Sequence, residues 1–315
     1  MRPITTAAWL LFVGCSLLSA PILAETRLTR ERNGDHYQFQ YAWQTPTGAA
    51  YEITMAQDIE AIHQSFRKYR GYELERANRE LRYRLLRYAK QQGWRGVEVT
   101  LSAREQQLDI VRRGRRASDA VLVDMHAAYE RLFNEYLTEH YYNRITGVGG
   151  QTGIKPDHIA IAEASSNIIL PLADAFRAVL GENTQRTYLE AVLSFMQGIP
   201  YQDLADRLES AGAGFNPPAR LLLEHQGDCD SKVTLMGALL RELMPDVPVY
   251  AVYVPNHAFL ALRMSQRDGE QSIMINDQSL LVVEPTGPAL LKIGELGETA
   301  ARYVSSGQYT TERFR

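Results

Sequence analysis

The sequence predicts an α+β fold in which a mainly helical front half with one β-hairpin precedes a back half made of a helix and a sheet. Three observations support this prediction. Charged, helix-favouring sequence dominates from Asp58 to Gln92, an apolar stripe at helical spacing follows Cys229, and four short strand candidates come after that stripe. A helix followed by a meander of strands indicates an antiparallel sheet and α+β organisation.

The composition is that of a globular protein with a substantial core. The chain has 315 residues, of which 45% are hydrophobic and 23% are charged, which suits one large domain or two ordinary ones. The formal net charge of -3 is close to neutral for this length, so no overall field favours nucleic acid or an anionic membrane surface. No repeat of fixed period is present, which leaves solenoid and propeller folds unsupported.

The first 24 residues predict a secretory signal peptide. Arg2 precedes an apolar run from Ala7 to Leu23, and the small Ala24 stands before a polar stretch, so cleavage after Ala24 is expected. An uncleaved anchor is the second interpretation, because Pro21 and polar interruptions make a poor spanning helix. Lipid attachment at Cys15 is the third. The sequence therefore predicts a periplasmic or secreted protein without a stable membrane span, with signal-anchored and lipid-anchored forms as alternatives.

Residues 25–184 are predicted to form the mainly helical front half. Polar and apolar residues alternate on both sides of a turn at 45–48, which predicts a β-hairpin. Ser118 is the expected N-cap of a long helix that ends near Tyr142. The other elements expected are two helices within 58–92 broken near Gly71, a strand at 97–101, and one or two helices within 157–180.

Two unusual segments of this half predict no ligand. The glycine-rich stretch 147–153 follows a helical segment and lacks the Lys-Ser/Thr ending of a phosphate-binding loop, so we expect a simple loop. The basic cluster 112–116 has no interleaved aromatic residues, which favours a solvated linker over a site for an anionic partner.

Residues 185–315 form the back half, where the residues that carry chemistry lie. A helix over 187–197 is stopped by Gly198 and Pro200, and a polar loop follows. The next helix begins at Cys229. Its apolar stripe is Val233, Met236, Leu240 and Leu243, and the strand candidates after it are 249–254, 257–264, 272–275 and 280–283.

Cys229 is a candidate nucleophile. If cleavage removes Cys15, Cys229 is the only cysteine of the mature chain, so it has no internal disulfide partner. Gly227 and Asp228 favour a helix start, and backbone amides at a helix N-terminus stabilise a thiolate. The carboxylates of Asp228 and Asp230 oppose that effect if they point the same way. An inert core thiol is the alternative interpretation.

His257 and Glu284 are the candidate partners of this thiol. His257 begins the second strand directly after Pro255-Asn256, where a titratable ring stands at the mouth of an apolar element and could act as a general base. Glu284 ends the last strand and could hold the tautomer of the histidine through a hydrogen bond. A satisfied structural histidine and an exposed glutamate at a strand end are the ordinary alternatives.

In this order and context the motifs resemble the transglutaminase-like superfamily, in the branch of bacterial transglutaminase-like cysteine peptidases. The matching pieces lie between about Thr187 and Pro288 and are Gly227-Asp228-Cys229-Asp230 at a helix start, Asn256-His257-Ala258-Phe259-Leu260, and Glu284-Pro285-Thr286. The resemblance implies a papain-like core, in which a helix bearing the cysteine packs on an antiparallel sheet. It also implies that Cys229 attacks a carbonyl, His257 moves the proton, and an acid orients the imidazole.

Two further residues are assigned through this resemblance. The family usually has aspartate as the third catalytic member, so Glu284 is a departure and Asp277 is the alternative acid. The segment from Gln197 to Tyr201 is similar to one that recurs in related sequences, and Gln197 is the candidate side-chain donor of an oxyanion hole, together with the Cys229 amide.

Three functions fit these residues. The first is hydrolysis of an amide bond in a protein or peptide of the cell envelope, through a thioester on Cys229. The second passes the acyl group to an amine and so crosslinks proteins; sequence does not separate it from the first, because the difference depends on water exclusion around the thioester. The third is a non-catalytic binding module whose front half recruits an envelope partner. No cofactor or metal is expected, since no two histidines lie at ligand spacing on one helix.

Overall fold

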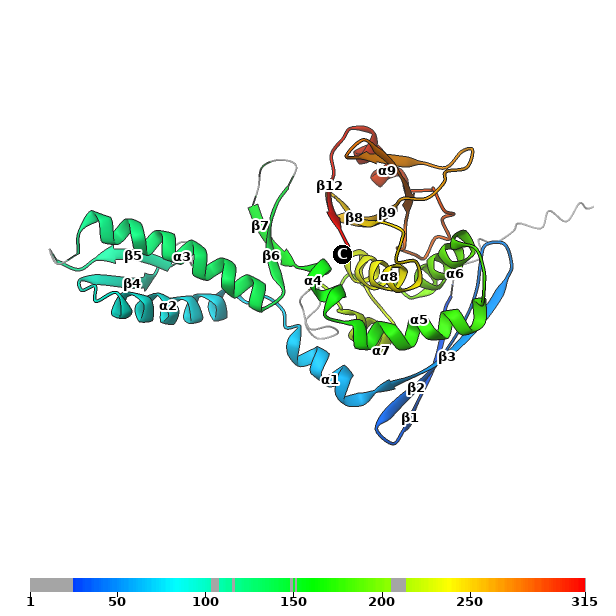
Figure 1. Ribbon diagram of the computed structural model, residues 1–315, viewed down its shortest axis with the longest axis horizontal. Helices are drawn as coiled ribbons and strands as arrows, with labels where there is room; N and C mark the ends of the chain where they lie inside the picture. Colours follow the sequence, from blue (N-terminus) through cyan, green and yellow to red (C-terminus); the bar gives the residue numbers. More distant parts are fainter. Residues whose placement is uncertain are drawn as a thin grey trace, which may run out of the picture.

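The computed structural model in Figure 1 describes residues 25–102, 108–114, 117–147, 150, 152–204 and 214–314. The predicted signal peptide, with Cys15, lies outside these residues. Within the described ranges, no helix combines the length and the apolar character needed to cross a membrane.

A five-stranded antiparallel sheet forms the back half. Its order is β10-β11-β9-β8-β12, so β9 is the central strand. A two-residue turn at Pro255 and Asn256 joins β8 to β9 and pairs Val254 with His257. Asn256 has a φ of 60°, a left-handed conformation that asparagine tolerates in such turns. The strands are β8 (Val249–Val254), β9 (His257–Leu262), β10 (Ser272–Ile275), β11 (Gln278–Val283) and β12 (Thr310–Arg313).

Helix α8 (Cys229–Leu243) packs on one face of this sheet and is enclosed by other helices. Every residue from Ser231 to Leu240 is buried. Residues of β9 enter two hydrophobic clusters in alternation, Leu260 on the α8 side and Phe259 on the side of α9 (Glu298–Ser305). This two-sided burial explains why the strand is apolar throughout. The helices that surround α8 are α4 (His158–Glu163), α5 (Ser166–Leu180), α6 (Gln185–Gly198) and α7 (Pro218–Glu224).

A second antiparallel sheet, formed by the first residues of the described chain, packs on the same core. Trp43 lies against Phe176 and Phe195 with ring centroids 5.4 and 5.2 Å apart. The largest hydrophobic cluster therefore takes residues from both sides of the domain boundary predicted near residue 184, and that boundary stays a prediction. The strands are β1 (Arg27–Asn33), β2 (His36–Gln44) and β3 (Ala50–Asp58), in the order β1-β2-β3.

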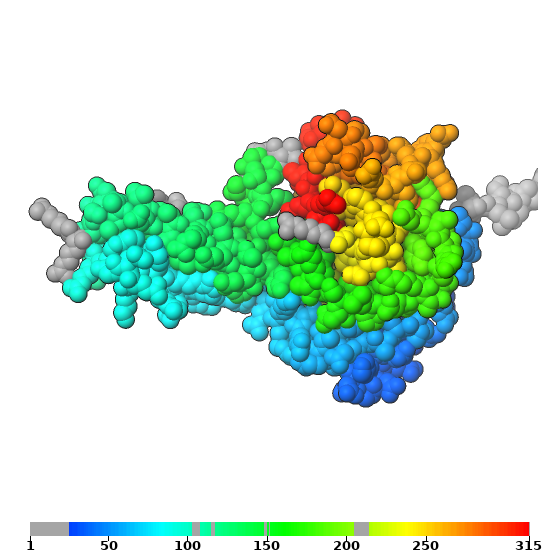
Figure 2. All heavy atoms as spheres, viewed as in Figure 1, coloured from blue at the N-terminus to red at the C-terminus, as the bar shows by residue number. Residues whose placement is uncertain are grey.

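Between these two parts of the core the chain forms an arm that projects from the body (Figures 1 and 2). Two long helices pair with each other and with a β-hairpin, and the arm has two hydrophobic clusters separate from the main one. Helix α1 (Ile59–Lys68) leads into the arm, and a second hairpin leads back to α4. The arm contains α2 (Leu74–Gln91), β4 (Val97–Leu101), β5 (Leu108–Arg112) and α3 (Asp119–Glu139), and the returning hairpin is β6 (Tyr142–Thr146) and β7 (Thr152–Pro156).

Most of the expected elements are present, and several others, among them β5, α9 and β12, were not predicted. Ser118 caps α3 as predicted, since its side chain accepts a hydrogen bond of 3.3 Å from the Val121 amide. The hairpin at 36–58 gains β1 as a third strand, and strands β6 and β7, which pair with each other, come before and at the end of the glycine-rich stretch, part of which lies outside the described residues. The segment containing Pro218, predicted to be loop, begins α7, because proline suits the first turn of a helix.

The C-terminal end of the chain is expected to depend on a glycine in α8. A Cβ atom at Gly237 would overlap the ring of Phe314, which is 3% exposed and is held by a hydrogen bond of 3.0 Å from its amide to the Val249 carbonyl. We expect Gly237→Ala to lower the free energy of unfolding by about 1–2 kcal/mol in denaturant titrations, because overpacking outweighs the gain in helix propensity. In a Phe314→Ala background the same substitution should instead be stabilising. A stabilising Gly237→Ala in the otherwise unaltered protein would contradict this account.

Candidate active site

The N-terminus of α8 places Cys229 at the first position of the helix. Asp228 is the N-cap, and its side chain accepts a hydrogen bond of 2.9 Å from the Ser231 amide and another from the Ser231 hydroxyl. The Asn216 amide in turn donates to the Ser231 hydroxyl at 2.7 Å. Cys229 is a free, half-buried thiol. The cap therefore fixes where the helix starts and thereby where the sulfur lies.

His257 and Glu284 are brought together by the pairing of β9 with β11. Val283 pairs with Leu260 in the sheet, so the residue after β11 lies close to the beginning of β9. The His257 Nε2 atom and the Glu284 Oε2 atom are 2.5 Å apart, and the Glu284 Oε1 atom accepts a hydrogen bond of 3.0 Å from the Thr286 amide. Because Nε2 is engaged by the carboxylate, Nδ1 is the ring nitrogen left to exchange a proton.

The thiol lies against the start of β9, the strand that begins with His257. The backbone amides of Ala258 and Asp230 donate hydrogen bonds to the Cys229 thiol, which act to lower its pKa. Ala258 directly follows His257 in the chain. Asp230 is a further common neighbour, since its Oδ1 atom lies 3.9 Å from the Cys229 Sγ atom and its charge also acts on His257.

The pKa of the thiol is raised, contrary to the expected effect of the helix N-terminus. Burial is the largest cause, followed by the charges of Asp230 and Asp228, and together they raise the pKa of Cys229 to about 12. Amide hydrogen bonds reduce this rise but do not cancel it. The sulfur is therefore a thiol at neutral pH, and attack on a carbonyl needs a base to take its proton.

His257 has the properties of that base. Burial alone would lower the pKa of the imidazole, but the hydrogen bond and charge of Glu284, together with the charge of Asp230, raise it above the ordinary value of histidine. A carboxylate on Nε2 stabilises the imidazolium that forms when the ring accepts a proton. The directions of the two pKa shifts disfavour a thiolate formed beforehand and favour a proton on the imidazole.

Gln197 lies beside Glu284 but does not offer a donor to the site. Its Nε2 atom donates to the Glu284 carbonyl at 2.8 Å and to the Leu291 carbonyl at 2.9 Å, which uses both hydrogens. A flipped amide would set its oxygen against two carbonyl oxygens, so this orientation is the favourable one. A cavity of about 500 Å³ lies on another side of Gln197, and Cys229, His257 and Glu284 do not line it. The oxyanion role predicted for Gln197 is thus not supported, and the residue instead fixes the backbone at Glu284.

Asp277 lies away from this constellation. It belongs to the turn between β10 and β11, where Asn276 and Asp277 have φ values of 49° and 60°. Glu284 follows the opposite end of β11. The structure therefore brings Glu284 to His257 and leaves the alternative acid at the far end of the strand.

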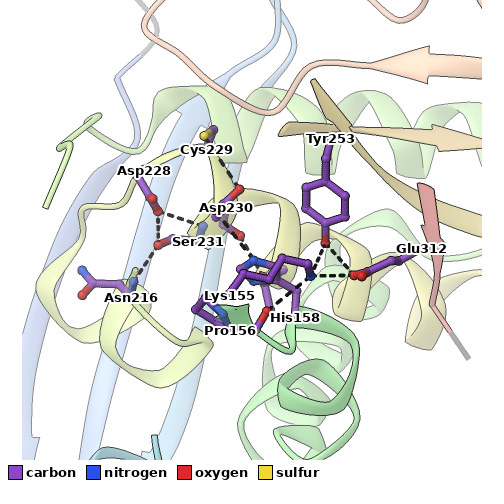
Figure 3. A network of polar contacts seen from close by, with 11 residues as sticks. Lys155, Pro156, His158, Asn216, Asp228, Cys229, Asp230, Ser231, Tyr253 and Glu312 are labelled. Carbon is purple, nitrogen blue, oxygen red and sulfur yellow. Dashed lines mark hydrogen bonds and ion pairs between the residues drawn. The ribbon is translucent and has the colours of Figure 1, made fainter. Parts of the chain in front are cut away.

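A buried polar network next to Asp230 was missed by the sequence reasoning (Figure 3). His158 is fully buried, with its Nδ1 atom 3.0 Å from the Thr234 hydroxyl and its Nε2 atom 3.7 Å from Asp230 Oδ2. Burial, and then the charge of Lys155, hold the pKa of His158 well below its ordinary value, so the ring is neutral. Lys155 pairs with Glu312 at 2.7 Å. No sequence signal identified this set, because its members come from α4, α8, β7 and β12.

The described residues contain no group of three or more histidine, cysteine, aspartate or glutamate side chains arranged to hold a metal ion. The ionisable groups near Cys229 are instead engaged with one another or with backbone atoms.

Comparisons with known proteins add little to this geometry. A scan against models of protein families found no match, and a search of curated proteins found none either. Among solved structures, LapG of Legionella pneumophila, in an EGTA-treated form, matches with 14% identity and a TM-score of 0.27, over 50% of this chain and 78% of that one. A likeness of this degree carries no functional argument, so the assignment depends on the residues themselves.

The charge of Asp230 should be measurable in the reactivity of the thiol. We expect Asp230→Asn to lower the pKa of Cys229 and to speed its alkylation by iodoacetamide at pH 8, about tenfold for each unit by which the pKa falls. Asp246→Asn, an exposed position beyond the other end of α8, serves as the control and should leave the rate unchanged. Equal rates in the two variants would show that Asp230 does not act on the sulfur.

Proposed function

We propose that this protein is a thiol-dependent amide hydrolase, a cysteine peptidase in which Cys229 is the nucleophile, His257 the general base and Glu284 the residue that orients the imidazole. The observation that carries the proposal is the 2.5 Å contact between a buried carboxylate and Nε2 of an imidazole whose strand begins at the half-buried thiol. This order of acid, imidazole and sulfur is the arrangement that acyl transfer requires.

The first half-reaction forms a thioester. The Cys229 sulfur attacks the carbonyl carbon of an amide while its proton passes to His257 Nδ1, and the carbonyl oxygen takes the negative charge. The Cys229 backbone amide, at the start of α8, is the donor for that oxygen. The C–N bond then breaks, and the leaving nitrogen takes the proton from His257 as the amine departs.

The second half-reaction restores the enzyme. Water attacks the thioester carbon while His257 accepts one of its protons, the C–S bond breaks, and the sulfur recovers that proton as the acid product leaves. Glu284, in contact with Nε2, stabilises the imidazolium each time it forms. Cys229 is partly exposed, so water can reach the thioester, and we propose water as the acceptor of the acyl group.

The substrate that fits the chain's proposed location is a protein or peptide of the cell envelope. The apolar leader supports export, and the resemblance of the Cys229, His257 and Glu284 motifs supports an amide as the bond that is cleaved. Residues 185–315 would supply the catalytic machinery, with residues 25–184 packing against it through β2, β3 and α5.

Removal of the sulfur tests the proposal directly. We expect Cys229→Ala to lower kcat/KM for hydrolysis of an envelope protein or peptidoglycan-peptide substrate by about 10⁴-fold or more, with an unchanged melting temperature as evidence that the fold is intact. Met236→Leu, a buried change in the same helix, is the matched control and should retain activity. Hydrolysis that persists in Cys229→Ala would refute the proposal.

A reaction that contains both water and a primary amine as acceptors distinguishes hydrolysis from transamidation. With a primary-amine probe in the reaction, we expect free acid as the main product and little amine in the acyl product, because water reaches the sulfur. Mass spectrometry of the products measures this ratio. Predominant amine incorporation would make the protein a crosslinking enzyme with the same acyl-enzyme.

A further inference from the structure

Lys232 is a charged side chain that the reaction above does not use, although it lies in the middle of the catalytic part. It is fully buried in α8, one turn after Asp228 and Cys229. Its Nζ atom donates a hydrogen bond of 2.5 Å to the Ile199 carbonyl. Burying an ammonium group in a protein interior is costly unless opposite charges and hydrogen bonds compensate for the lost water. The buried Lys232 therefore requires opposite charges nearby.

Two buried carboxylates act on Lys232 as opposite charges, although neither forms an ion pair with it among the described residues. The two are Asp228, which is 7% exposed, and Glu284, which is 3% exposed. Asp228 caps α8 and Glu284 contacts His257. Each of these carboxylates would be costly to bury as an ion without a nearby cation, and Lys232 is the cation on which both act.

Lys232 is also connected to the backbone that holds Glu284 in place. The Gln197 side chain donates to the Glu284 carbonyl, and two residues later the Ile199 carbonyl accepts from Lys232. The Pro200 carbonyl then accepts a hydrogen bond of 3.3 Å from the Gly227 amide, just before the cap of α8. One short segment thus links Lys232 to both the acid and the nucleophile.

Building on the proposed function, we propose that Lys232 is a positioning residue whose buried positive charge supports the contact of Glu284 with the imidazole of His257. It touches neither the substrate nor the reacting atoms and acts only through the His257–Glu284 pair. That pair binds protons as one unit, so its titration reports on the charge of Lys232.

The direction of the effect follows from the sign of the charge. Removing a nearby cation makes every protonated form of the His257–Glu284 pair more favourable, so both titration steps of the pair move to higher pH. Other ionisable groups of this region are Asp228, Cys229 and Asp230 on α8, Tyr201, and His225 at the end of α7. Burial, and then the charge of Asp230, raise the pKa of Asp228 to about 7. Burial lowers the pKa of His225, and the charge of Lys232 also acts to lower it. None of these groups replaces the lost cation.

The pH range of the effect follows from Lys232 itself. Burial lowers the pKa of the ammonium group to about 8, with the charges of Glu284 and Asp228 acting in the opposite direction. The unaltered protein therefore loses this cation above about pH 8. A protein with a neutral residue at position 232 should therefore differ most from the unaltered protein in its effect on the His257–Glu284 pair at pH 6 to 7. The difference should become smaller as the pH rises beyond 8, because the unaltered protein then also lacks the charge.

Titration of His257 by NMR, with labelled histidine in the full-length mature protein, tests the proposal without any substrate. We expect Lys232→Met to move the His257 titration to higher pH by about 1 unit, and Lys232→Arg, which keeps the charge, to restore it. In a Glu284→Gln background the shift caused by Lys232→Met should fall to less than half. Met236→Leu is the control for repacking within α8 and should leave the titration unchanged.

An unchanged His257 titration in folded Lys232→Met protein would overturn the proposal, as would a shift of equal size in the Glu284→Gln background. If Lys232→Arg does not fold, the comparison of Lys232→Met in the two Glu284 backgrounds still decides. Since the titration needs no turnover, its outcome is independent of whether Cys229→Ala abolishes hydrolysis. In an activity assay, the acid limb of the kcat/KM profile should move to higher pH in Lys232→Met, whereas a purely structural defect lowers activity at every pH.

Discussion

The packing of helix α8 on strand β9 is the constraint on which the site depends. The helix is buried from Ser231 to Leu240 and β9 is covered on both faces, so neither element can slide without opening cavities in the core. Cys229 is the first residue of α8, and His257 is the first residue of β9. A rigid apolar contact therefore fixes two polar side chains at its edge, and precision at the site comes from packing behind it.

The sequence predicted the elements that carry the site better than the contacts between them. A helix start at Asp228, strands that begin at His257 and end before Glu284, and the central place of β9 all follow from local patterns, because caps, turns and apolar runs are encoded within a few residues. The hydrogen bonds that Gln197 donates could not be predicted in this way, because they depend on where the carbonyls of Glu284 and Leu291 lie in three dimensions. Spacing along the chain contains no information on that point.

Lys232 and His158 are two polar residues whose burial local sequence patterns did not predict. In the sequence, Lys232 reads as a polar position in the first turns of an amphipathic helix, the place where lysine ordinarily faces water. It is buried because other elements cover all sides of α8. The arm is a further case: its own clusters make it a local unit inserted between β3 and α4, whereas the pattern alone suggested a division near residue 184.

The electrostatics of the candidate site bear on how the proposed catalysis would proceed. Burial is the largest cause of the raised pKa of Cys229, and with the charges of Asp230 and Asp228 it outweighs the backbone amides that donate to the thiol. The hydrogen bond and charge of Glu284, together with the charge of Asp230, raise the pKa of His257 against the effect of burial. In the resting protein the thiol keeps its proton, so no thiolate–imidazolium ion pair forms. In the proposed reaction the positive charge forms on the imidazole, and the negative charge forms on the substrate oxygen, only as the thiol attacks. Stabilisation is then directed at the transition state instead of at a resting ion pair, which is the condition under which binding energy accelerates the chemical step.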